Sequence, residues 1–69
     1  MAKKREWLIA LRKERKMTRA QLAESAGISV SYVDALERGQ RIGPVHTVKK
    51  LAAVLGFTLE RFYEEQEGI

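Results

Sequence analysis

Apolar residues recur at helical spacing along most of this chain, and no useful length of it alternates apolar with polar residues as a strand would. The clearest pattern runs from position 45 to position 55. Its apolar positions fall at spacings of three and four, as on one full core face of a helix: Val45, Val48, Leu51, Ala52 and Leu55. Pro44 suits the start of this helix because its missing N–H would be unpaired there, and Gly56 is expected to end it.

A second pattern predicts a short helix over residues 19–26. Its apolar stripe consists of Leu22, Ala23 and Ala26. Thr18 can cap the start of this helix, and Gln21, three residues later, suits the partner position of a capping box. Gly27 then permits the left-handed backbone conformation in which many helices end.

A third helix is expected over residues 29–37, with Ser29 as its cap and Gly39 just beyond its end. Val33 and Leu36 point to one side, which is expected to be the core. The outward positions are Val30, Ser31, Asp34 and Ala35. Two short helices that cross steeply through a glycine turn form a helix-turn-helix, whose second helix lies in the DNA major groove.

The flanking segments complete a single all-α domain over residues 1–69, with five helices in total. The first helix has Trp7, Leu8 and Leu11 as its stripe, and the last has Leu59, Phe62 and Tyr63. We expect Phe57 and Phe62 in the core, with Tyr63 and Ile69 available to an interface. The expected helices span 5–15, 19–26, 29–37, 45–55 and 59–65, with a loose basic arm at 1–4 and a frayed tail at 66–69.

The charge is distributed unevenly along the chain. The whole sequence has 13 basic and 9 acidic side chains, for a net charge of +4. Residues 1–19 hold eight of the basic and two of the acidic side chains, a net +6, so the other 50 residues sum to −2. A basic front favours an anionic partner such as nucleic acid, and a merely solvated helix face explains it equally well. Lys3, Lys4 and Arg5 are either a DNA-contacting arm or solubilising charge.

Catalytic chemistry is not expected from this composition. The chain has no cysteine and one histidine, so it lacks the usual ligands of a zinc site, and no cofactor is implied. His46 has no acid at a spacing typical of a catalytic pair and is expected at the surface. No apolar run approaches the roughly 18 residues of a membrane span, and no signal-peptide core is present. The default location is therefore cytoplasmic.

Four segments, taken in order, resemble the small lambda-repressor-like, or Xre/Cro-type, helix-turn-helix domains. They are LRKERKMT, QLAESAGIS, SYVDALERG and TVKKLAAVLGFTLERF, and the resemblance covers about Leu8 to Tyr63. It implies five helices around one core. It also implies an ion pair between an arginine late in the first helix and a glutamate near the end of the third, here Arg12 and Glu37.

The resemblance implies a DNA site centred on the third helix. The implied base-reading residues are Val30, Ser31, Asp34 and Ala35. The implied phosphate contacts are Arg19, Ser29, Tyr32, Arg38, Gln40 and Arg41. Position 30 is often long and polar in relatives and position 35 is often glutamine, so this chain departs from the family in base discrimination rather than in DNA binding.

Two functions are consistent with these residues. The first is a sequence-specific transcriptional regulator of the repressor type, which binds double-stranded DNA at an inverted repeat as a twofold homodimer, as relatives usually do. The second is a protein-interaction module, such as an antitoxin-like or antirepressor-like subunit that holds a protein partner. The first is the leading interpretation, and the acidic tail and the short, apolar reading face keep the second open.

Overall fold

The computed structural model describes residues 4–67, and side chains through Glu64. It contains five helices: α1 (Glu6–Glu14), α2 (Arg19–Ala26), α3 (Val30–Glu37), α4 (Val45–Leu55) and α5 (Leu59–Glu67). Among the described residues no strand occurs, and the all-α, five-helix prediction is confirmed. Residues 1–3 of the arm expected at 1–4 lie outside the described residues, as does the interface position Ile69. The expectation of a frayed tail at 66–69 is wrong for residues 66–67, which continue α5.

The helix ends follow from a few local interactions. The Thr18 hydroxyl accepts a hydrogen bond from the Gln21 N–H at 3.1 Å, and the Gln21 side chain accepts one from the Thr18 N–H at 2.8 Å. This is the predicted capping box. Gly27 takes a left-handed φ of 69°, and the Ser29 hydroxyl then accepts from the Tyr32 N–H at 3.1 Å to begin α3. The tight break between α2 and α3 is therefore built as the sequence predicts.

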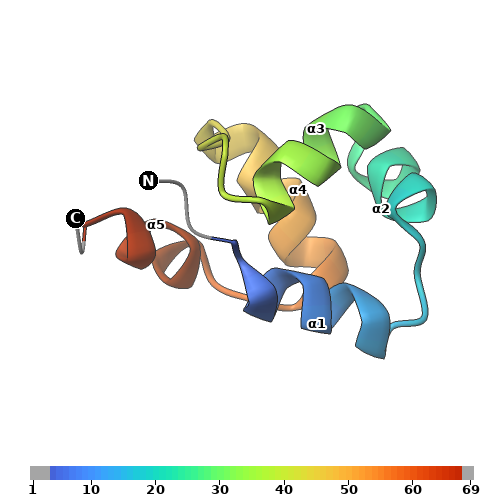
Figure 1. The fold of residues 1–69 in the computed structure, drawn as a ribbon, viewed down its shortest axis with the longest axis horizontal. Coiled ribbons are helices and arrows are strands. Elements are labelled where there is room, and N and C mark those ends of the chain that lie inside the picture. Colours follow the sequence, from blue (N-terminus) through green and yellow to red (C-terminus); the bar gives the residue numbers. More distant parts are fainter. Residues whose placement is uncertain (1–3, 68–69) are drawn as a thin grey trace.

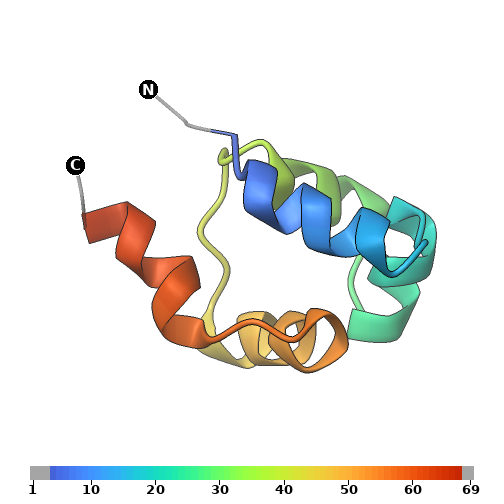
Figure 2. The same cartoon turned by 90° about the horizontal axis from the view of Figure 1, so that it is seen from below.

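Packing places α2 at the centre of the helix contacts. It lies against both α3 and α4, while α1 lies along α3 and α5 packs on α4 (Figures 1 and 2). α5 lies at the end of the molecule opposite α2 (Figure 1). The buried core consists of Leu8, Leu22, Ala23, Ala26, Val33, Leu36, Val48, Leu51, Leu55, Phe57 and Phe62. The core positions predicted for Phe57 and Phe62 are confirmed.

The prediction of a full core face on α4 is wrong at its first position. Val45 is 55% exposed, whereas Val48, Leu51 and Leu55 are buried. Helical spacing places Val45 on the same stripe, one turn earlier, but the buried side of α4 begins at Thr47 and Val48, which are 5% and 0% exposed. Val45 instead borders a shallow groove beside α5 that Leu59, Glu60, Tyr63 and Glu64 also line.

The loop between α3 and α4 is held against α5 and α4 at Gly43. The Tyr63 hydroxyl donates to the Gly43 carbonyl oxygen at 2.8 Å. Gly43 is itself buried, and a Cβ added there would meet the Val48 side chain at 3.2 Å. The loop is thus held close to the core rather than standing free in solvent. This matters because the loop carries Gln40 and Arg41, two predicted phosphate contacts.

Candidate nucleic-acid interface

The helix α3 divides into a buried side and an outward side. Val33, Leu36 and Glu37 are buried, each 1% exposed. The outward side carries the four predicted base-reading positions. Val30 and Ser31 are exposed, whereas Asp34 and Ala35 are partly buried. The core contacts of α3 therefore leave these four side chains on the face that a major groove would meet.

A shallow hollow of about 470 Å³ lies between the start of α3 and the loop that follows the helix. It brings together two predicted base readers and four predicted phosphate contacts. Its lining is Ser29, Ser31, Tyr32, Ala35, Gln40 and Arg41. The Ser29 hydroxyl oxygen accepts the capping hydrogen bond, so its own O–H remains free to donate. Hydroxyl, amide and guanidinium donors in one hollow are suited to an anion or to base edges.

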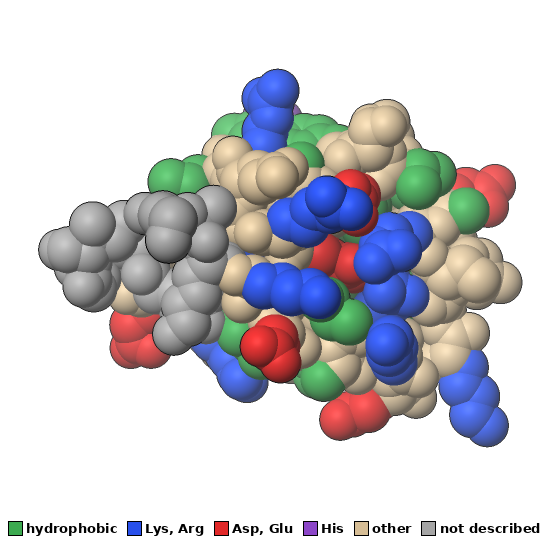
Figure 3. All heavy atoms as spheres, in the orientation of Figure 1, with side chains coloured by type: hydrophobic (Ala, Val, Ile, Leu, Met, Phe, Trp, Pro, Cys, Tyr) green, Lys and Arg blue, Asp and Glu red, His purple; other side chains and the backbone are tan. Residues whose placement is uncertain are grey.

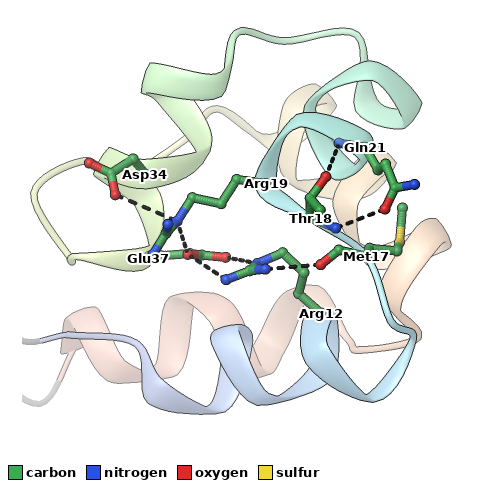
Figure 4. Close-up of polar contacts among 7 residues, drawn as sticks. All are labelled: Arg12, Met17, Thr18, Arg19, Gln21, Asp34 and Glu37. Atoms are coloured by element: carbon green, nitrogen blue, oxygen red, sulfur yellow. Dashed lines mark hydrogen bonds and ion pairs between the residues drawn. The ribbon is translucent and has the colours of Figure 1, made fainter.

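Behind the outward side of α3 lies a buried ion pair that joins α1 to α3. Arg12 Nε donates to Glu37 Oε2 at 2.6 Å, and Arg12 Nη2 donates to Oε1 at 3.4 Å (Figure 4). Arg12 Nη1 also donates to the Met17 carbonyl oxygen at 2.9 Å. The structure thus joins the two residues of the expected ion pair. The contact is bidentate, which gives an arginine–carboxylate pair a fixed geometry.

Two further arginines extend this pair to the surface. Arg19 Nε donates to Glu37 Oε1 at 2.9 Å and lies 3.6 Å from Asp34 Oδ1 (Figure 4). Arg38 Nε lies 3.1 Å from Asp34 Oδ2. We refer to Arg12, Arg19, Asp34, Glu37 and Arg38 as the arginine–carboxylate cluster. Its three cations and two anions leave one net positive charge.

Sequence spacing indicates only some of the contacts in the arginine–carboxylate cluster. The Asp34–Arg38 pair has the i,i+4 spacing of helical ion pairs, and that spacing could have identified it. The contact from Arg19 to Glu37 joins residues 18 positions apart through the helix turn, so no local spacing indicates it. Two residues expected to bind phosphate are therefore already engaged with carboxylates.

No sequence pattern indicated a buried, structural role for Arg5, and the interpretation that places it in a basic arm is wrong. Its side chain is 1% exposed. Its Nη1 donates to the carbonyl oxygens of Leu36 and Arg41, and its guanidinium lies 4.3 Å from the centre of the Phe62 ring. The last carbonyls of a helix lack intrahelical donors, and Arg5 supplies one to α3. It thereby ties the end of α3 to the loop that carries Arg41.

The electrostatics of this face follow from the cluster. In Figure 3, Lys and Arg side chains gather on the face between α1 and α3, with carboxylates among them. In the part of the chain that the structure describes, no group of three or more His, Asp or Glu side chains is placed to hold a metal ion. Among the same residues, no helix has the length and apolar character needed to cross a bilayer.

The chain is similar in sequence to known helix-turn-helix proteins. A family profile described as helix-turn-helix matches residues 8–62. The chain is 39% identical over 57 residues to the immunity repressor protein of Bacillus phage phi105. The aligned residues make up 83% of this chain and 40% of that protein. It is 45% identical over 56 residues to the HTH-type transcriptional repressor RghR of Bacillus subtilis (strain 168), covering 80% and 42%. The chain thus spans about two-fifths of the length of these relatives.

Proposed function

The chain belongs to the lambda-repressor-like, Xre/Cro-type helix-turn-helix family, and from that premise we propose that it is a sequence-specific DNA-binding transcriptional repressor. Both relatives carry the word repressor in their names. The observation that carries the proposal is the outward side of α3, which lies beside a hollow lined by hydroxyl, amide and guanidinium groups. Such a helix with flanking donors matches the way this motif enters the major groove and holds the backbone.

In this proposal α3 reads bases with short side chains. The Ser31 hydroxyl donates to or accepts from a base edge. Val30 and Ala35 offer apolar contact, for which the thymine methyl group is the partner in the major groove. Asp34 can accept a hydrogen bond from cytosine N4. Base discrimination should therefore be modest, with thymine preferred at the apolar positions.

Phosphate contacts supply most of the affinity. Arg41 and Gln40 at the hollow, together with Ser29 and Tyr32 at the start of α3, hold one phosphate strand. Arg19 and Arg38 hold a neighbouring stretch of backbone, helped by the free N–H groups at the start of α2. Contacts of this kind release counterions, so the affinity falls as the salt concentration rises.

Two copies bind together as a twofold dimer. Ile42 and Val45 are 58% and 55% exposed, and Val45 borders the groove at α5. Exposed large apolar side chains favour a contact with another protein surface. A second copy placed there would present two α3 helices to half-sites about one helical turn apart, roughly 34–36 Å. Val45→Glu should therefore shift the protein toward monomer in sedimentation equilibrium, without a loss of helix content.

Selection of bound sequences from a pool of random duplexes tests the proposal. We expect an inverted repeat whose half-sites are spaced by one helical turn, with thymine enriched opposite Val30 or Ala35. Ser31→Ala should change the preference at one or two base pairs, whereas Arg41→Ala should weaken binding on all sequences alike. A pool that stays featureless would contradict sequence-specific recognition.

The exposed apolar side chains also favour a second candidate function, that of a protein-interaction module. In that case Ile42 and Val45 contact a different protein, and α3 does not enter DNA. Duplex binding and partner capture distinguish the two candidates. A module of this kind would show no salt-dependent binding to duplex DNA at low salt, and Val45→Glu would abolish its capture of the partner.

A further inference from the structure

We propose that Asp34 competes with DNA phosphate for Arg38, and that it thereby weakens the binding of this protein to unselected duplex DNA. The inference rests on the proposed DNA-binding function and adds a selectivity role for one side chain of the cluster. Its basis is the position of Asp34 between two arginines that the DNA-binding proposal assigns to the phosphate backbone.

The carboxylate of Asp34 lies between the two arginines. Its two oxygens lie 3.1 Å from Arg38 Nε and 3.6 Å from Arg19 Nε. The side chain is 34% exposed and that of Arg38 is 60% exposed, so both are accessible at the surface. A guanidinium binds carboxylate and phosphate oxygens in the same manner. Arg38 must therefore exchange one anion for another when it binds DNA.

The two arginines are not held equally. Arg19 also donates to Glu37 at 2.9 Å, and Glu37 is itself buried and paired with Arg12. For Arg38, Asp34 is the one acidic partner within the described part of the chain. Loss of the Asp34 charge would leave Arg19 anchored and would release Arg38. It would also raise the net charge of the arginine–carboxylate cluster from +1 to +2.

The Asp34–Arg38 ion pair is expected to contribute little to the stability of the fold. Asp34 and Arg38 are four residues apart on one helix, and exposed pairs of this type contribute little to stability. Asparagine has almost the same shape as aspartate and a similar helix propensity. Asp34→Asn should thus change the Tm by no more than about 4 °C while it alters DNA binding. A purely structural role would change the two together.

The test compares wild type and Asp34→Asn on duplex DNA of random sequence over a series of salt concentrations. We expect the variant to bind roughly three- to tenfold more tightly, as the release of one exposed cation allows. The slope of log K against log salt should steepen by about 0.9, the value for one added phosphate contact. Glu14→Gln removes the same charge at the exposed end of α1 and serves as the matched control, with no change expected.

A double variant identifies the cation that is released. Arg38→Ala on its own should weaken binding slightly, and Asp34→Asn should gain nothing when it is added to Arg38→Ala. A gain that persists in the double variant would overturn the competition for Arg38, as would equal slopes for wild type and Asp34→Asn. If neither protein binds duplex DNA at low salt, the proposed function fails and this inference fails with it.

Discussion

Replacement of Glu37 by glutamine would remove the negative charge that lies between two arginines. Arg12 would then stay buried with no counter-charge, because Glu37 is its ionic partner and both oxygens of that carboxylate are engaged. Breaking one side of a buried ion pair costs about 3–5 kcal/mol. A domain of 69 residues has a total stability of roughly 3–10 kcal/mol, so the variant would lose a large share of it.

Thermal and urea unfolding followed by circular dichroism would measure this loss. Each kcal/mol shifts the Tm of so small a domain by about 4–8 °C, so we expect a fall of at least about 12 °C, or the absence of a cooperative transition. Arg12→Met combined with Glu37→Gln should recover part of the stability, since the double variant leaves no buried charge unpaired. A Glu37→Gln protein with an unchanged Tm would refute the view that this pair fixes α1 to α3.

Three further substitutions test other contacts through urea unfolding. Arg5→Ala should cost about 2–4 kcal/mol, because carbonyl oxygens at the end of α3 and in the following loop lose a charged donor; a cost below about 0.5 kcal/mol would contradict that role. Tyr63→Phe should cost about 0.5–1.5 kcal/mol through loss of the hydrogen bond to Gly43, and an unchanged midpoint would mean that the bond adds nothing. Lys16→Gly should stabilise by about 0.5–1 kcal/mol, since Lys16 holds a φ of 57° that glycine adopts without strain; a loss of stability would show that the lysine side chain contributes more than its backbone costs.

Local patterns predicted the helices because each signal acts within a few residues. The capping box of Thr18 and Gln21 and the left-handed Gly27 are both fixed by sequence neighbours. Val33 and Leu36 fall on the buried side of α3 because helical spacing decides which side they share. These same features set the orientation of the outward face. The placement of the base-reading positions on that face is therefore a consequence of local sequence.

The burial and the partners of several residues depend on tertiary contacts that local sequence patterns do not indicate. Arg5 is buried because the end of α3 and the loop beyond it present carbonyl oxygens to it, and both lie more than 30 residues away. Val45 is exposed although helical spacing places it on the same stripe of α4 as the buried Val48. The double role of Glu37, which binds Arg12 and Arg19 together, requires three helices to meet. No spacing within one helix could have indicated any of these.

Binding of duplex DNA by the face of α3 can be measured by titrating the wild-type chain against random duplex at about 50–200 mM salt. We expect binding at the low end of this range and a linear fall of log K with log salt, with a slope of about −0.9 for each phosphate contacted. Arg41→Ala should reduce that slope by about one contact. Absence of binding at the lowest salt concentration, or binding that salt does not affect, would contradict DNA binding by this face.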